Sequence, residues 1–269
     1  MTLIKVRLWQ RPSLKQARNA YTFEARMRRE DSGGVRLLEV LPGPGIQQCL
    51  RLELCGSQLT EAMPGQYCLL GSQGVDLSCS YVSLPGMARR FTVTTHRTQA
   101  LGQAGDVLDY SGPLGSAWPI PLHSARLLAI TRGEGILALL GCLDEILCWL
   151  PWVQVQLSHE GFPHDQLPDD CLHRLSTLSP LPRNSCSGWA QLADQLTHFK
   201  PDTVYCCAPA HIARQAARLC WQHGVPAQRI WLRTDQVAPQ AERWRSALEG
   251  PVQRYDRVLA MLNRPPPPG

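Results

Sequence analysis

The sequence predicts a two-domain α+β protein, in which a small antiparallel β-barrel precedes a parallel α/β domain. Two features of its 269 residues lead to this prediction. Up to about His123, short β-rich runs alternate with Pro-Gly turns, as in small barrels. Beyond that residue, buried strands alternate with helices, as in a parallel sheet whose strands are connected by helices. The chain is long enough for two modest domains.

The predicted barrel strands contain many apolar and β-branched residues, often at alternating positions. Turn-forming residues separate them at Pro42-Gly43-Pro44-Gly45, Pro64-Gly65 and Pro85-Gly86. The strands are expected at residues 35–40, 50–54, 67–70, 80–83 and 91–95. Several short strands at this spacing favour a small barrel.

The α/β pattern starts with a buried strand at 127–131, which leads into a glycine turn and an apolar helix over about 136–150. Further strands are expected at 152–157, 204–207 and 229–233, and further helices at 188–198 and 209–223. Residues 161–186 are rich in Pro, Asp and Ser and are expected to form a long connection.

The predicted domain boundaries follow these changes of pattern. They are 1–33 for a basic N-terminal extension, 34–123 for the barrel, 124–240 for the α/β domain, and 241–269 for a helical tail with a Pro-rich end. The basic extension is expected to present a solvated face. The alternative is an arm that docks on an acidic partner.

Composition excludes several classes of protein. The net charge of +5 is a mild excess, and the few aromatic residues do not alternate with basic ones, which argues against nucleic-acid binding. Asp144 and Glu145 interrupt the longest apolar run, so no membrane span is expected. Eleven cysteines without a CxxC pair argue against an iron–sulfur or structural zinc site. No signal peptide is recognised, so we expect a cytoplasmic protein with free thiols.

Five short motifs follow one another along the chain. They are Pro64-Gly65-Gln66-Tyr67, Cys79-Ser80-Tyr81-Val82-Ser83, Gly112-Pro113-Leu114-Gly115, Arg132-Gly133-Glu134-Gly135-Ile136 and Val204-Tyr205-Cys206-Cys207-Ala208-Pro209. The fourth combines a strand, a glycine turn and a helix N-terminus, an arrangement that can face nucleotide phosphates. Their order and spacing resemble the ferredoxin-NADP reductase superfamily, flavoproteins that pass electrons between a nicotinamide nucleotide and a protein partner.

The resemblance implies a barrel that binds FAD, or FMN, and an α/β domain that binds NADPH or NADH. It implies that Cys207 is the catalytic residue, because it would position the nicotinamide for hydride transfer. The cofactor-binding residues that it implies are Tyr67, Tyr81, Val82, Ser83, Gly112, Pro113, Leu114, Gly115, Arg132, Gly133, Gly135, Ala208 and Pro209. Electrons would leave to a redox partner protein or to a larger reductase or oxygenase complex.

Several positions depart from the family's motifs. Cys79 stands where the family has an arginine for the flavin diphosphate, and Val82 stands where it has a hydroxyl. Arg89 or Arg90, a few residues downstream, is a candidate for the missing cation. Glu134 stands in the nucleotide turn, where its charge would repel a phosphate but would suit a helix N-terminus.

Three functions therefore remain open at the level of sequence, and the third of them is a sensor that binds a flavin or a nucleotide without turnover. The first is a flavin-dependent oxidoreductase that passes electrons from NAD(P)H through the flavin to a separate partner. The second is a non-catalytic subunit of the same fold that binds neither cofactor and serves assembly, docking or regulation of a redox complex.

Overall fold

The computed structural model describes residues 33–42, 47–56, 61–72, 75–86, 89–96, 102–161, 188–234 and 251–262. All of them belong to the unit Gly33–Gly269. The expectations for the basic extension, for nearly all of the 161–186 connection and for the Pro-rich end lie outside these residues.

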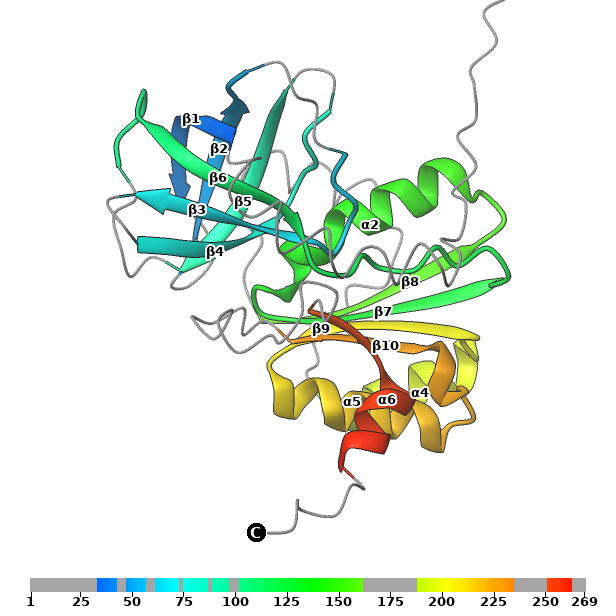
Figure 1. The fold of residues 1–269 in the computed structure, drawn as a ribbon. Coiled ribbons are helices and arrows are strands. Elements are labelled where there is room, and N and C mark those ends of the chain that lie inside the picture. Colours follow the sequence, from blue (N-terminus) through cyan, green and yellow to red (C-terminus); the bar gives the residue numbers. More distant parts are fainter. Residues whose placement is uncertain are drawn as a thin grey trace, which may run out of the picture. The chain divides into compact units, whose positions relative to one another are not determined.

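Six strands of the described residues form a closed barrel (Figure 1). Every neighbouring pair in it is antiparallel, in the order β1-β2-β5-β4-β3-β6. The strands are β1 (Gly33–Pro42), β2 (Gln47–Leu54), β3 (Tyr67–Ser72), β4 (Val75–Tyr81), β5 (Arg90–His96) and β6 (Val107–Leu114). Because side chains alternate along a strand, each strand sends every second residue into the barrel. Those residues form one apolar cluster that includes Leu37, Leu52, Leu70, Val93 and Leu108.

The second sheet has five strands within the described part of the chain, in the order β11-β10-β9-β7-β8. Four are parallel, and β11 pairs antiparallel with β10. The strands are β7 (Arg126–Arg132), β8 (Gln154–Glu160), β9 (Thr203–Ala208), β10 (Ile230–Thr234) and β11 (Val252–Arg254). The connecting helices are α2 (Gly135–Trp149), α4 (Trp189–Phe199) and α5 (Ala210–Gln222), with α6 (Tyr255–Leu262) last and a short η2 (Ala227–Arg229) before β10.

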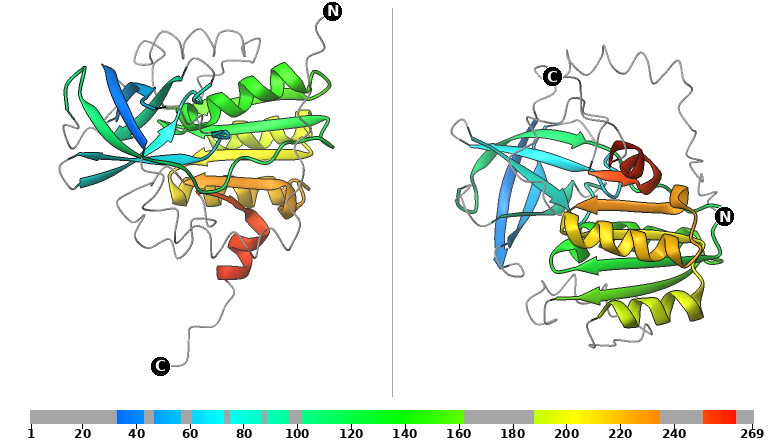
Figure 2. Two further views of the ribbon diagram at one scale, coloured as in Figure 1. Left: turned by 45° about the horizontal axis from the view of Figure 1, so that its top comes forward. Right: turned by 90° about the horizontal axis from the view of Figure 1, so that it is seen from below.

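Helices cover both faces of this sheet (Figures 1 and 2). On one face, α2 packs against Leu127, Ala129 and Tyr205. On the other face, α4, α5 and α6 pack against a second apolar cluster that includes Leu128 and Val204. Consecutive buried residues of β7 and β9 belong alternately to the two clusters. Both faces of these strands are therefore buried, which explains their continuous apolar runs in the sequence.

The α2 face also holds the contact with the barrel. Cys49 and Val82 of the barrel belong to the same apolar cluster as the buried side of α2. Trp118, which follows β6, donates a hydrogen bond from its indole Nε1 to the carbonyl oxygen of Ala138 in α2 (3.4 Å). These contacts attach the outer face of the barrel to the first helix of the α/β domain.

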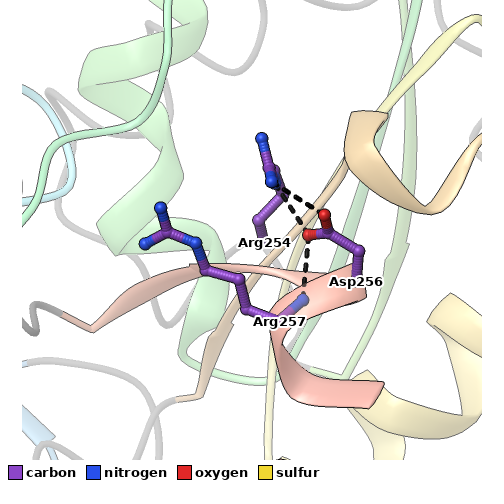
Figure 3. A network of polar contacts seen from close by, with 3 residues as sticks. All are labelled: Arg254, Asp256 and Arg257. Carbon is purple, nitrogen blue, oxygen red and sulfur yellow. Dashed lines mark hydrogen bonds and ion pairs between the residues drawn. The ribbon is translucent and has the colours of Figure 1, made fainter. Parts of the chain in front are cut away.

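The fold class is confirmed, but the C-terminal segment differs from the prediction. Residues 252–254 form a strand where a helix was expected, and the helix begins only at Tyr255. Asp256 fixes this junction, because its carboxylate accepts two hydrogen bonds from the Arg254 guanidinium and one from the Arg257 backbone N–H (Figure 3). Residues 252–254 form a strand because the edge of β10 supplies their backbone hydrogen-bond partners, and the local sequence does not reveal this pairing.

Within the described residues, no helix is long and apolar enough to span a membrane.

Candidate functional site

A row of residues crosses the sheet near the carboxyl ends of its parallel strands. The strand registers place His159 of β8 opposite Thr131 of β7, Thr131 opposite Cys207 of β9, Cys207 opposite Arg233 of β10, and Arg233 opposite Val252 of β11. Ligands of open α/β sheets bind beyond this edge. We call these five residues the carboxyl-end row.

The row faces the α2 side of the sheet. Cys207 and Val252 belong to the apolar cluster around α2, and the hydroxyl of Thr131 lies 2.9 Å from Nδ1 of His159. Cys207 is fully buried, next to Ala208 at the end of β9. Pro209 follows as the residue that caps α5. The predicted catalytic thiol therefore lies in the middle of this row.

Arg233 connects the row to the barrel. Its side chain is almost completely buried, at 1% exposure. Nη1 donates a hydrogen bond to the carbonyl oxygen of Gly65 (2.7 Å), and Nη2 donates a short one to the Ser80 hydroxyl. Gly65 belongs to the first motif of the barrel and Ser80 to the second, the predicted flavin motif. The structure thus places a buried positive charge beside the strand that carries the second motif.

The two faces of β4 have different surroundings. Cys79 and Tyr81 point into the barrel, where the Tyr81 hydroxyl lies 2.5 Å from that of Tyr110. Ser80 points outward to Arg233, and Val82, just past the strand, packs in the α2 cluster. Burial raises the pKa of Tyr81 well above its ordinary value, because the charged phenolate would lose its hydration there. Ser80 and Val82 are therefore the residues of this motif that lie outside the barrel.

Ser83 and the β6 motif also make contacts within the barrel. The Ser83 hydroxyl accepts a hydrogen bond from the backbone N–H of Thr92 (2.9 Å). A methyl group at Gly112 would lie 2.8 Å from the Cβ of Cys68 and 2.9 Å from the Tyr81 hydroxyl. Glycine is therefore required at position 112 for the chain's own packing, independently of any ligand.

Tyr67 and the end of β6 lie close to the C-terminal strand. Tyr67 pairs with Leu114 in the barrel, and its ring lies against Gly115. Pro113 and Leu114 are half-buried. Just beyond this motif, the Ser116 hydroxyl donates a hydrogen bond to the carbonyl oxygen of Val252 (2.8 Å). The GPLG motif, the PGQY turn and β11 thus meet at one place.

The predicted nucleotide turn is held by the end of β8. The Gly133 backbone N–H donates to the carbonyl oxygen of Glu160 (2.8 Å), and the Arg132 guanidinium forms an ion pair with the Glu160 carboxylate. Gly133 has a φ of 57°, which produces the tight turn before α2 starts at Gly135. The turn has the shape that the motif predicts. Arg132 is half-exposed and already neutralised by Glu160.

An aromatic pair lies in the apolar cluster around α2. The rings of Trp118 and Tyr205 are stacked, with centroids 5.0 Å apart. The Tyr205 hydroxyl donates a short hydrogen bond to the carbonyl oxygen of Pro119. Tyr205 precedes Cys207 by two residues and lies on the same face of β9. This pair fixes the segment between the two domains against the face that carries Cys207.

The two candidate cations after β4 differ in their contacts. Arg90 is exposed, and its Nε donates to the Glu53 carboxylate (3.1 Å). Arg89 has a left-handed backbone conformation, with a φ of 61°. Its Nε and Nη2 are buried and have no hydrogen-bond partner in the part of the chain that the structure describes.

Comparison with known proteins gives the class of the fold. No protein-family profile matches the chain. Among solved structures, it is similar to an NADH-dependent reduced ferredoxin-NADP oxidoreductase (TM-score 0.62, 17% identity, 84% of this chain and 92% of that one). It is also similar to a cytochrome P450 reductase from Amycolatopsis (0.62, 18%, 76% and 69%) and to phthalate dioxygenase reductase (0.62, 13%, 90% and 83%).

The chain therefore has the fold of the ferredoxin-NADP reductase superfamily, as its motif order predicts. A curated relative is described as a probable dihydroorotate dehydrogenase B (NAD(+)) electron transfer subunit from Methanopyrus kandleri. It is 29% identical over 180 residues, which cover 61% of this chain. The match spans 66% of that relative's length, slightly less than two thirds.

Sequence reasoning did not single out Arg233. A signal for it was present, because Trp231 and Arg233 alternate with the apolar Ile230 and Leu232 in a strand that pairs on both sides. A charged residue at the end of such a strand must find polar partners. Nothing in the local sequence shows that those partners lie more than 150 residues away.

Proposed function

We propose that the chain is a flavin-dependent electron-transfer oxidoreductase. It takes electrons from NADPH or NADH and passes them through FAD, or FMN, to a separate redox partner. The observation that carries the proposal is the junction between β10 and the barrel, where Arg233 connects the carboxyl-end row to two motifs of the barrel. The curated relative is described as an electron transfer subunit, which supports the same class of function.

The residues around Arg233 suit a flavin chemically. A flavin carries ring carbonyls and phosphate groups, which require hydrogen-bond donors and positive charge. Arg233 and the Ser80 hydroxyl can supply donors beside β4. We infer that the flavin would be held by these two residues and by the turns at Gly65–Tyr67 and Gly112–Gly115.

The nucleotide would be bound at the turn from Arg132 to Gly135. The turn precedes the N-terminus of a 15-residue helix, where backbone N–H groups favour an anion. Glu160 opposes this attraction, because it pairs with Arg132. Binding of a phosphate would therefore require Arg132 to exchange its partner.

Cys207, Ala208 and Pro209 would form the wall beside the nicotinamide. The backbone of Cys207 is fixed on both sides, by β7 and by β10, and that of Ala208 by β10. The bound cofactors would supply the chemistry, with hydride passing from the nicotinamide to the flavin and electrons leaving to the partner. The role of the chain is to bind, orient and exclude water.

The partner would be a separate redox protein or a larger reductase or oxygenase complex. Two of the similar structures are described as reductases of cytochrome P450 and phthalate dioxygenase systems. We place the protein in the cytoplasm. All nine cysteines of the described residues are free thiols, as expected in a reducing compartment.

A second candidate function is a non-catalytic subunit of a redox complex. It is favoured by the surroundings of the two motifs: Cys79 and Tyr81 are enclosed in the barrel, and Arg132 is neutralised within the chain. In that case the fold would serve assembly, docking or regulation, and neither cofactor would bind.

One experiment separates the two candidates. The purified protein is titrated with FAD and FMN, and its visible spectrum is recorded before and after anaerobic addition of NADPH or NADH. The proposed reductase is expected to bind flavin, to turn yellow with it, and to lose this visible absorbance when NADPH or NADH reduces the flavin. A protein that takes up neither flavin contradicts the proposal and supports the second candidate.

The motif assignment has its own test. Tyr81→Ala is expected to weaken flavin binding if Tyr81 shapes the site, directly or through the barrel. Tyr81→Phe keeps the ring and serves as the matched variant. If the affinity for flavin is unchanged in Tyr81→Ala, the flavin does not depend on this residue.

A further inference from the structure

Two consecutive arginines follow β4 and have opposite surroundings. Arg90 begins β5, is exposed, and pairs with Glu53. Arg89 is half-buried and held by its backbone, since its N–H donates to Gly86 (2.9 Å) and its carbonyl oxygen accepts from the Leu54 N–H (2.9 Å). The backbone of Arg89 is thus fixed independently of its side chain.

The side chain of Arg89 has an unusual pair of buried donors. Nε and Nη2 are both buried, and neither has a partner among the described residues. These two nitrogens form one edge of the guanidinium, from which two parallel N–H bonds can reach a planar or tetrahedral anion. Arg254 uses the same edge for Asp256, with both distances at 2.7 Å. In Arg89 this edge has no acceptor from the described chain.

The backbone conformation of Arg89 is unusual as well. Its φ of 61° is uncommon for a residue other than glycine, asparagine or aspartate. Burial of charged donors without a partner is unfavourable too. Both features persist at functional sites, where a ligand or the surrounding structure compensates for them.

We propose that the Nε–Nη2 edge of Arg89 is an anion site that binds a phosphoryl group. This proposal rests on the proposed function, in which the phosphoryl group is that of the flavin. Arg89 would then supply the positive charge that Cys79 cannot. Cys79 lies inside the barrel, so its position could not carry this charge outward. Arg89 lies in the loop that connects β4 to β5, eight residues after Tyr81.

The phosphoryl assignment follows from the chemistry of the fork. A guanidinium edge matches phosphate and carboxylate alike, but FAD and FMN have phosphate groups and no carboxylate. Riboflavin has the same ring without a phosphate. The site therefore predicts discrimination between flavins by phosphate, while the ring contacts remain common to all of them.

The test compares Arg89→Gln with Arg90→Gln in the full-length protein. Equilibrium titrations measure the affinities for FAD, FMN and riboflavin. We expect Arg89→Gln to weaken FAD and FMN binding about tenfold to a hundredfold, as loss of a charged bidentate contact implies. Riboflavin binding should remain unchanged in both variants, and Arg90→Gln should resemble the wild type for all three ligands. Arg89→Lys keeps the charge without the fork and should lie between.

Flavin binding by the wild type tests the proposed function, and the effect of Arg89→Gln tests the anion site. If the wild type binds FAD and Arg89→Gln binds it equally well, the anion site is wrong and the function stands. If the wild type binds no flavin, the function fails, and inorganic pyrophosphate then tests the site alone. Pyrophosphate should raise the Tm of the wild type and of Arg90→Gln, but not that of Arg89→Gln. Equal stabilisation of all three proteins overturns the proposal.

A variant that fails to fold is recognised by its circular dichroism. In that case Arg89→Lys, which conserves the charge, takes its place in the same titrations. A loss of affinity confined to NADPH or NADH would overturn the assignment to the flavin.

Discussion

Glu145 places a carboxylate on the partly buried side of α2, next to Asp144. Burial, and to a smaller extent the neighbouring Asp144 charge, raises the pKa of Glu145 above its ordinary value of 4.5. The charged form is therefore less favourable in the folded state than in the unfolded chain. Above the folded pKa this lowers the stability of the fold. Below 4.5 the effect disappears, because both states are protonated.

Glu145→Gln should consequently stabilise the protein at pH 7. A rise in Tm of about 1–3 °C is expected for a domain of this size, because the charge is partly screened by solvent. The advantage should shrink as the pH falls through the folded pKa and vanish below 4.5. Thermal unfolding of both proteins between pH 4 and pH 8 measures this. A constant difference in Tm across that range would show that charge is not the cause.

Tyr81 shows what sequence can and cannot predict for a single residue. Its membership in the second motif was readable, and so was the strand that contains it. The direction of its side chain was not. Both faces of β4 are buried, one by the barrel and one by the α/β domain, so polarity does not distinguish them. Alternation then leaves two equivalent choices, and the structure places Tyr81 inside.

The turn between β7 and α2 depends on a neighbouring element. Gly161, directly after β8, approaches it so closely that a Cβ on Gly161 would lie 2.7 Å from the Gly133 nitrogen. This contact is with backbone, which cannot rotate away. Gly161 also has a φ of 142°, which few other residues adopt. The end of β8 thereby fixes the shape of the predicted nucleotide turn.

Gly161→Ala should disturb this turn and lower the free energy of unfolding by about 1–3 kcal/mol. Gly33→Ala is a suitable control, because a Cβ there would meet no atom within 4 Å. Urea denaturation of the two variants and the wild type compares their stabilities. If Gly161→Ala unfolds at the same urea concentration as Gly33→Ala, the close contact between Gly161 and Gly133 does not set the turn.

The elements themselves were largely readable, since most barrel strands and the alternating α/β elements occur near their predicted positions. Two elements differ from their predicted bounds. Trp152 and Val153 precede β8 instead of starting it, and β11 replaces part of a predicted helix. A three-residue strand such as β11 is too short to show an alternating hydrophobic pattern in the sequence. It exists because the edge of β10 offers it hydrogen-bond partners.

At the scale of the whole described unit, the barrel and the α/β sheet are joined by one apolar cluster and by Arg233. The sequence predicted both parts but not their contact. The residues of the contact belong to segments that are far apart in the chain, such as Cys49, Val82 and Ile136. Each of them reads as an ordinary apolar residue within its own element.

Arg233 should therefore contribute to the stability of both parts together. Replacement by Met removes the guanidinium and leaves the Gly65 carbonyl oxygen and the Ser80 hydroxyl buried without this donor. A loss of about 2–4 kcal/mol is expected, because breaking a buried charged contact leaves unsatisfied partners. Arg233→Lys retains the charge and should lose less. Arg254→Met removes an arginine whose side chain pairs with Asp256 two residues away, and serves as the control.

The measurement is urea denaturation followed separately by tryptophan fluorescence and by far-ultraviolet circular dichroism. Wild type and Arg254→Met should each show one transition at the same urea concentration with both probes. In Arg233→Met the transition should move to lower urea. The two probes should also separate, because the barrel and the sheet would no longer unfold as one unit. If Arg233→Met keeps the wild-type midpoint with coincident probes, the contacts of Arg233 are not what holds the two parts together, and its role beside β4 is then not structural.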